Sequence, residues 1–280
     1  MTIRLHAVCC ACFLFVSAIN TQHAAAQVLP DGTTPTEINT VGSESTISRG
    51  SIRGPNQFHS FESFSVQSGE RITFVSPGGV QNIINRVTGG NLSKIDGEIR
   101  QRGGEANLFL LNPKGIVFGP DSKLDVNASF IASTASSVLF EDETSFDVGP
   151  QNNSSLFTSS IPVGLQFGEE AGAIHSQARN SQDPVPVGLG VPTGQTLALI
   201  GNGVSITGEP VANSDGFQGY AGITALRGRI EFGSVAQGEK VDLEPVSNRL
   251  SDGWTVGYES VESFQEISLS AALLASSSFE

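Results

Sequence analysis

The sequence predicts an all-β protein, and its spacing favours a parallel β-helix. Helical periodicity is almost absent after residue 30. Short apolar runs rich in β-branched residues instead alternate with Gly, Asn, Asp, Ser and Pro. From Ile95 to Val138 this alternation recurs so often that it suits a chain coiling in rungs of roughly 20 residues.

The predicted strands are four to five residues long for the most part, which is short even for strands. In chain order they cover residues 71–75, 115–118, 129–132, 196–200, 204–207, 222–226 and 229–232. An antiparallel sandwich would favour longer strands joined by two-residue hairpins. Asp-Gly pairs that could form such hairpins begin at residues 31, 96, 215 and 252, so the pattern alone leaves a sandwich open.

Two segments interrupt the alternation. Residues 141–160 are acidic and polar and are predicted to leave the regular structure. Residues 176–194 are rich in Gln, Pro and Gly and are predicted to form a loop. Strand candidates of the same style resume after each, so neither segment is predicted to be a domain boundary.

Composition and charge exclude one large class of function. The 280 residues allow one large domain or two small ones. The formal net charge is -13, and the few Lys and Arg residues are scattered. A nucleic-acid-binding protein needs clustered basic residues to neutralise phosphates, so that class is excluded.

The N-terminus has the pattern of a secretory signal peptide. A basic start is followed by an apolar run over residues 7–19 and by small residues that end at Ala26. We expect residues 1–26 to be removed by cleavage between Ala26 and Gln27. The alternative is an uncleaved anchor, but the run is shorter than the about 20 residues of a membrane-spanning helix. All three cysteines (9, 10 and 12) lie in this run, so the mature chain is expected to have no disulfide and no thiolate site.

No catalytic or metal-binding motif stands out in the mature chain. Its two histidines, His59 and His175, have no nucleophile elbow or other catalytic context, so we predict a strand residue at His59 and no catalytic residue. The acidic run at Glu141, Asp142, Glu143 and Asp147 could hold calcium, but a solvated turn is the preferred interpretation. No metal and no cofactor are predicted.

One stretch of the sequence is more informative than the others. A predicted strand over residues 107–111 runs into Asn112-Pro113-Lys114-Gly115-Ile116 and then into a second strand. Asn favours the start of a turn, Pro fixes φ, and Gly can adopt positive φ. The residues alone therefore predict a tight corner between two strands.

This stretch and several others resemble the N-terminal secretion domain of filamentous-haemagglutinin-type exoproteins, the haemagglutination-activity domain of two-partner secretion. Asn112 to Ile116 resembles the family's N-P-N-G-I signature, with Lys114 in place of the usual second Asn. The residues that carry the rest of the resemblance are 58–66, 82–90, 93–97, 107–109, 124–126, 129–135, 162–168, 194–199 and 228–235.

The resemblance implies a fold and a role. The implied fold is a right-handed parallel β-helix, a solenoid with an N-terminal β cap and extra-helical strands. The implied role is secretion: after export by the signal peptide, the periplasmic domains of an outer-membrane β-barrel transporter recognise the domain. The transporter then passes the exoprotein to the cell surface or the medium, where it acts as an adhesin towards a ligand on a host or neighbouring cell. The residues predicted to carry secretion competence are Asn112, Pro113, Lys114, Gly115 and Ile116, by direct contact or by shaping the domain.

These inferences give a domain organisation and two alternatives. We expect a signal peptide over 1–26, a secretion domain over 27–270, and an irregular tail over 271–280 where a longer exoprotein is truncated. The protein is predicted not to be an enzyme. The first alternative is a β-helix carbohydrate-active enzyme, a lyase or hydrolase, which would need paired carboxylates in one cleft. The second is a secreted structural protein without a dedicated transporter.

Overall fold

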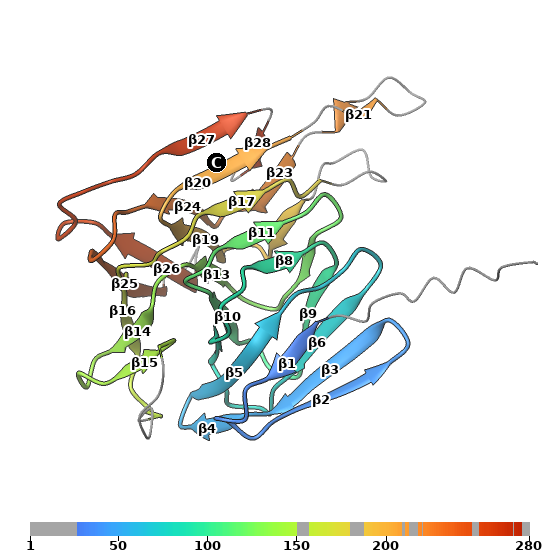
Figure 1. The fold of residues 1–280 in the computed structure, drawn as a ribbon, viewed down its shortest axis with the longest axis vertical. Helices are drawn as coiled ribbons and strands as arrows, with labels where there is room; N and C mark the ends of the chain where they lie inside the picture. The colour runs from blue at the N-terminus through green and yellow to red at the C-terminus, as the bar shows by residue number, and fades with distance from the viewer. Residues whose placement is uncertain are drawn as a thin grey trace, which may run out of the picture.

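The computed structural model describes residues 27–149, 157–179, 188–208, 211–212, 218–219, 221–247, 252–270 and 272–275. These residues form strands joined by turns and bends, with no helix among them (Figure 1). The prediction of an all-β fold is therefore confirmed. The predicted signal peptide lies outside the described residues.

The largest sheet, sheet A, runs through the middle of the molecule. Its strands pair in the order β1-β5-β7-β10-β13-β19-β24, and β4 pairs with β5. They are β1 (Val28–Pro30), β4 (Ser51–Arg53), β5 (Asn56–Phe64), β7 (Asn82–Val87), β10 (Asn107–Leu111), β13 (Phe130–Ser133), β19 (Thr196–Gly201) and β24 (Arg229–Ser234). From β5 to β24 each pairing is parallel, whereas β1 and β4 pair with β5 antiparallel.

Two further sheets are mainly parallel. Sheet B contains β2 (Thr36–Val41), β3 (Glu44–Arg49), β6 (Arg71–Val75), β9 (Glu98–Arg102) and β12 (Lys123–Asp125), and only the β2–β3 pairing is antiparallel. Sheet C contains β8 (Ser93–Ile95), β11 (Ile116–Phe118), β17 (Ile174–Ser176), β20 (Val204–Thr207) and β27 (Ile267–Ser270), all parallel. In Figure 1 the strands of sheet C lie one above another in chain order.

The chain visits these three sheets in a repeating order. From β7 to β13 it passes from sheet A to sheet C to sheet B and back to sheet A, twice. We call one such passage a circuit. Hydrogen bonds link equivalent positions in neighbouring circuits. Asn107 Nδ2 donates to Asn82 Oδ1 at 3.0 Å, 25 residues away, and the backbone N–H of Ser129 donates to Asn107 Oδ1 at 3.3 Å, 22 residues away. These separations are slightly longer than the predicted rungs.

The remaining strands lie outside this repeat or extend it. Sheet D is antiparallel and contains β14 (Ser137–Phe140), β15 (Ser145–Asp147), β16 (Pro162–Gln166), β25 (Lys240–Ser247) and β26 (Asp252–Gly257). Sheet E is parallel and contains β18 (Leu189–Val191), β23 (Ala221–Ala225) and β28 (Ala272–Ala275), and β21 (Val211–Ala212) pairs with β22 (Gln218–Gly219). The pairing in the molecule as a whole is therefore mixed.

The central strands of sheet A are buried on both faces. One face contributes Ile83, Leu108 and Leu110 to a core cluster shared with sheets B and C. The other face contributes Ile84 and Phe109 to a second cluster, which packs against sheet D. Strands buried on two sides need apolar residues at successive positions instead of alternating ones. This explains the continuous apolar runs of β10 and β19, and why four-residue segments can form stable strands.

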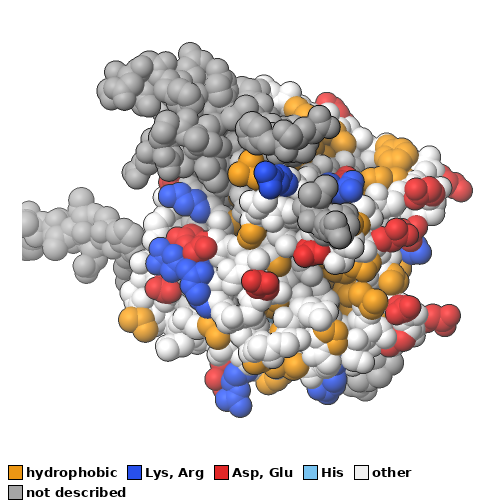
Figure 2. Space-filling model, turned by 180° about the vertical axis from the view of Figure 1, so that it is seen from behind, with side chains coloured by type: hydrophobic (Ala, Val, Ile, Leu, Met, Phe, Trp, Pro, Cys, Tyr) orange, Lys and Arg blue, Asp and Glu red, His pale blue; other side chains and the backbone are white. Residues whose placement is uncertain are grey.

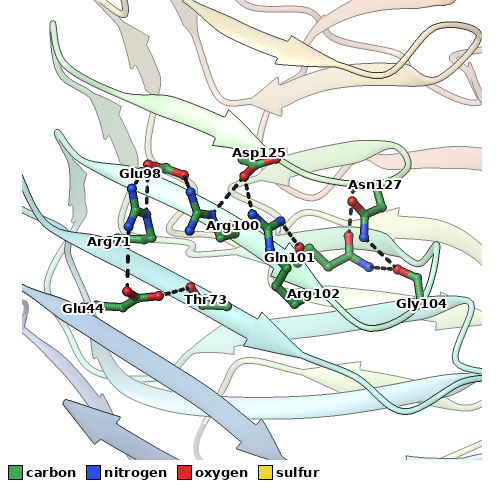
Figure 3. Close-up of polar contacts among 10 residues, drawn as sticks. All are labelled: Glu44, Arg71, Thr73, Glu98, Arg100, Gln101, Arg102, Gly104, Asp125 and Asn127. Carbon is green, nitrogen blue, oxygen red and sulfur yellow. Dashed lines mark hydrogen bonds and ion pairs between the residues drawn. The ribbon is translucent and has the colours of Figure 1, made fainter. Parts of the chain in front are cut away.

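The outer face of sheet B carries a ladder of ion pairs (Figure 3). Glu98 lies between Arg71, 2.9 Å away, and Arg100, 2.8 Å away, and the closest approach in each pair joins a guanidinium nitrogen to a carboxylate oxygen. Asp125 contacts both Arg100 and Arg102, at 2.9 and 2.8 Å. On the molecular face in Figure 2, some of the Lys and Arg side chains likewise lie next to Asp and Glu side chains. The basic residues of the ladder are therefore paired with acidic ones.

The structure corrects the two segments predicted to be irregular. Residues 141–160 include the strand β15, whose Phe146 is buried in the second cluster. Residues 176–194 include the strand β18, whose Leu189 is buried in the first cluster. Each prediction missed one strand, because β15 and β18 are three residues long and lie in polar or Gly- and Pro-rich surroundings, so local composition concealed them.

Candidate functional site

The Asn-Pro corner joins β10 of sheet A to β11 of sheet C. Asn112 Oδ1 accepts a hydrogen bond from Lys114 N at 3.0 Å, and the Asn112 carbonyl accepts one from Gly115 N at 3.0 Å. Gly115 has a φ of +116°, which side-chain-bearing residues rarely adopt. The residue types therefore form the tight corner that the sequence predicts.

The side chain of Asn112 is buried and reaches into the preceding circuit. Its Nδ2 donates to the Asn91 carbonyl and to Ser93 Oγ, both at 3.0 Å. Ile116 is fully buried in the core cluster, and Gly115 is also buried. Asn112, Gly115 and Ile116 consequently shape the corner from inside.

Pro113 and Lys114 face outwards, where another segment packs on them. The Pro113 carbonyl accepts a hydrogen bond from Gly172 N at 2.7 Å. Lys114 Nζ forms an ion pair with the Glu170 carboxylate. The hydrogen bond and the positive charge of Lys114 lower the pKa of Glu170. The chain that leaves sheet D is thereby fixed against the corner.

These two residues line a cleft of about 710 Å³. The cleft is formed by six separate parts of the chain. Its described lining consists of Asp31, Thr33, Val87, Thr88, Gly89, Pro113, Lys114, Ser136, Val148, Gly149, Gly168, Glu169 and Glu170. Several segments that carry the family resemblance therefore meet in one place, including the RVTGG stretch, the Asn-Pro corner and the end of residues 162–168.

Arg86 holds the wall of this cleft together from behind. Its side chain is fully buried, and Nε donates to Ser60 Oγ at 2.7 Å. Its terminal nitrogens donate to the Asp147 carbonyl at 2.5 Å and to Thr33 Oγ1 at 3.0 Å. Its guanidinium carbon also lies 4.4 Å from the ring centroid of Phe146. Burial lowers the pKa of Arg86, against the charges of Asp31 and Asp147. One side chain thus connects sheet A, the N-terminal segment and sheet D.

Asp31 is the acidic counterpart of Arg86 in the cleft wall. Its Oδ2 accepts hydrogen bonds from Ser60 Oγ at 2.5 Å and Thr88 Oγ1 at 2.9 Å, and its Oδ1 accepts two from Thr33. Partial burial raises the pKa of Asp31, but these hydrogen bonds outweigh it and hold the pKa below its ordinary value. Asp31 is therefore an ionised structural acceptor.

Among the predicted site residues, the structure brings Pro113 and Lys114 into the cleft and places Asn112, Gly115 and Ile116 behind it. Ala26 lies outside the described residues. Gln27 precedes β1, and its carbonyl accepts hydrogen bonds from Ser65 N and Ser63 Oγ, both at 3.1 Å.

The residues of the site that were not predicted from the sequence include Asp31, Arg86, Thr88 and Glu170. A lone Arg within the otherwise uncharged strand of residues 82–87 was a usable signal for Arg86. Asp31 and Glu170 had no comparable signal, because Asp31 meets Ser60 and Thr88 from 29 and 57 residues away, and Glu170 meets Lys114 from 56 residues away.

The two histidines lie in different sheets. His59 is buried in β5, where Nδ1 lies 2.9 Å from Thr36 Oγ1, and His175 is exposed on β17. Burial lowers the pKa of His59 to about 3. The prediction that His59 is a strand residue is confirmed.

In the part of the chain that the structure describes, no group of three or more His, Cys, Asp or Glu side chains could hold a metal ion. Asp142 of the acidic run accepts hydrogen bonds from Thr144 Oγ1 at 2.6 Å and Thr158 Oγ1 at 2.5 Å. Within the same residues, no helix has the length and apolar character needed to cross a membrane.

Comparisons with known proteins identify relatives of the whole chain and of part of it. The model of the family described as "TPS secretion domain" matches residues 26–279. The heme/hemopexin-binding protein of Haemophilus influenzae (strain ATCC 51907 / DSM 11121 / KW20 / Rd) is 28% identical over 112 residues, which is 39% of this chain and 12% of that protein.

Two solved structures are similar at low sequence identity. The HMW1 secretion domain from Haemophilus influenzae is 16% identical with a TM-score of 0.48, and the match covers 90% of this chain and 56% of that one. The filamentous hemagglutinin secretion domain is 15% identical with a TM-score of 0.48, and the match covers 88% of this chain and 75% of that one.

Proposed function

Because this chain belongs to the TPS secretion domain family, we propose that it directs the export of a two-partner-secretion exoprotein through an outer-membrane β-barrel. In this proposal the signal peptide, residues 1–26, takes the chain to the periplasm and is cleaved between Ala26 and Gln27. Periplasmic domains of the transporter then recognise the secretion domain, residues 27–270, and the exoprotein passes to the cell surface or the medium.

The observation that supports a recognition site is the convergence of separate sequence segments on one cleft. Asp31, Thr88 and Lys114 come from different parts of the chain and line the same cavity. Clefts with an apolar lining and a few fixed polar groups are the usual places where proteins bind partners or ligands. We therefore propose the cleft as the surface that the transporter contacts.

Within the Asn-Pro corner we propose two roles. Asn112, Gly115 and Ile116 act on secretion by holding the corner in shape, as their burial supports. Pro113 and Lys114 act by contact, as their position in the cleft supports. Loss of either group of residues would reduce export, but only loss of the first would also reduce stability.

We also propose that sheets A, B and C are the faces of a right-handed parallel β-helix. The repeated circuit through the three sheets and the parallel pairing of β7, β10 and β13 support this. In this proposal β1 to β4 form the N-terminal cap, and sheet D supplies the extra-helical strands. A crystal structure of the secreted chain would test the handedness directly.

The activity of the exported protein is a separate proposal. The chain spans 12% of the curated relative that it matches. We propose an adhesin role at the cell surface, towards a ligand on a host or neighbouring cell.

We propose that the domain is not an enzyme. A glycosidase needs a protonated carboxyl group as its general acid. In the cleft, the hydrogen-bonded Asp31 and the Lys114-paired Glu170 both have a lowered pKa and favour the ionised state. These two carboxylates are therefore unsuited to that step, which argues against the carbohydrate-active alternative.

The test is secretion with and without the barrel. The full chain would be expressed in a heterologous Gram-negative host, alone or with a candidate outer-membrane barrel from the same source organism. We expect extracellular protein only with the barrel, and N-terminal sequencing should begin at Gln27. Equal extracellular yields under both conditions would reject the proposal and favour a secreted protein without a dedicated transporter.

A further inference from the structure

The mouth of the cleft has an unequal set of charges. Asp31, Glu169 and Glu170 supply three carboxyl groups, and Lys114 supplies the one ammonium group among the described lining residues. Asp31 is already engaged by Ser60, Thr33 and Thr88. The carboxylates that a binding partner could contact are therefore those of Glu169 and Glu170, which are both exposed.

The Glu170 carboxylate at this mouth can exchange Lys114 for another cation. The Lys114 side chain is 40% exposed and that of Glu170 is 79% exposed. Ion pairs in such solvent-accessible positions contribute little to stability, so opening this one costs little. An incoming cation could take the place of Lys114 beside Glu170 without disturbing the buried corner behind it.

Below the mouth the cleft is apolar. Val87 and Val148 are buried core residues that also line the cleft, and Pro113 adds a ring that is partly exposed. A fitting occupant would therefore place an apolar side chain against these residues and a cationic group at the rim.

We propose that the cleft selects a polypeptide segment with an apolar residue next to a Lys or Arg, and that Glu169 and Glu170 are its specificity-determining residues. The inference rests on the proposed function, because the segment would belong to the periplasmic part of the transporter. Charge complementarity between that cation and the acidic rim supplies selectivity and fast association.

The experiment measures binding of the purified periplasmic part of the barrel to the full mature chain by isothermal titration calorimetry at two salt concentrations. The test variant is Glu169→Lys/Glu170→Lys. The matched control is Glu105→Lys/Glu141→Lys, which makes the same change in net charge at exposed residues outside the cleft lining. A neutral variant, Glu169→Gln/Glu170→Gln, separates loss of the carboxylates from repulsion. Thermal unfolding of each variant verifies that it folds.

We expect the test variant to raise the Kd by about tenfold or more and to weaken the salt dependence, with the neutral variant in between. The control should change the Kd less than about twofold. Equal weakening by test and control, or no change in either, would overturn the inference and leave the proposed function standing. If the unmutated chain does not bind the barrel at all, the proposed function itself fails.

Discussion

The side-chain amide of Asn112 donates a hydrogen bond to the hydroxyl oxygen of Ser93, 3.0 Å away, and ties the Asn-Pro corner to the preceding circuit of the chain. The same nitrogen donates to the Asn91 carbonyl, and the Asn112 Oδ1 accepts from Lys114 N. Both polar atoms of the Asn112 side chain therefore form hydrogen bonds within the protein.

Replacement of Asn112 by Ala should therefore destabilise the fold. The change removes three hydrogen bonds and leaves buried partners unsatisfied, which costs about 1–3 kcal/mol. Urea unfolding of the purified mature chain would measure it. Lys114→Ala is the control and should stay within about 0.5 kcal/mol, because it removes only a surface ion pair. Similar losses in both variants would contradict the division of the corner into buried and outward residues.

Arg86 should be the side chain whose loss most weakens the cleft wall. Arg86→Ala removes contacts to Ser60, Thr33 and Asp147 at once, and we expect a loss of about 3–5 kcal/mol in the free energy of unfolding. Arg86→Lys should recover little of it, since an ammonium group cannot reach several partners in the manner of a planar guanidinium. Arg53→Ala is an exposed control. Full stability of Arg86→Lys would show that only the charge matters.

The adjacent glycines Gly89 and Gly90 of the RVTGG segment should differ in how well they tolerate a side chain. A Cβ on Gly89 would lie 2.0 Å from the Glu62 carbonyl oxygen, whereas a Cβ on Gly90 would meet nothing within 4 Å. Gly89→Ala must shift the backbone and should cost about 1–3 kcal/mol. Gly90→Ala should be neutral or slightly stabilising. Thermal unfolding of the two variants would test this, and equal melting temperatures would contradict the close packing at Gly89.

The ion pairs on sheet B should matter less than the core beneath them. Arg100 contacts Glu98 and Asp125, but these side chains are 19–46% exposed. Arg100→Gln should cost about 1 kcal/mol or less, and the difference from the unmutated chain should shrink in high salt. Phe109 is fully buried between sheets A and D and contacts Trp254, so Phe109→Ala should cost about 3–5 kcal/mol. A larger effect of Arg100→Gln than of Phe109→Ala would mean that the ladder is the main stabilising feature.

The sequence predicts the strands well where apolar residues are continuous. The prediction of residues 71–75 coincides with β6, and that of residues 196–200 falls one residue short of β19. It failed at β15, where one apolar residue, Phe146, stands among polar neighbours. Phe146 is buried because Phe58, 88 residues earlier, packs edge-on against it at 5.0 Å between ring centroids. Such a contact depends on tertiary structure and leaves no local signal.

The candidate site shows the same limit. Pro113 and Lys114 could be identified because their turn chemistry is contiguous in sequence. The link between Asp31 and Thr88, 57 residues apart, arises only when the N-terminal segment packs beside β7. Sequence reasoning thus found the corner of the cleft and missed the wall that completes it.

The pH dependence of stability should reveal His59. This side chain is neutral and buried, with a pKa lowered from 6.5 to about 3 by desolvation. In the unfolded chain it binds a proton below about pH 6.5, so falling pH favours the unfolded state until the folded pKa is reached. The loss of folding free energy therefore begins near pH 6.5, amounts to about 2–3 kcal/mol at pH 4.5, and levels off near pH 3.

Other groups also titrate in this range, so the quantity to measure is the difference in the free energy of unfolding between the unmutated chain and His59→Gln, determined by urea unfolding at each pH. Their stabilities should converge as the pH falls, because the variant has no histidine to protonate at this position. A difference that stays constant from pH 7.5 to pH 4.5 would mean that His59 is not held neutral beside Thr36 in the folded protein.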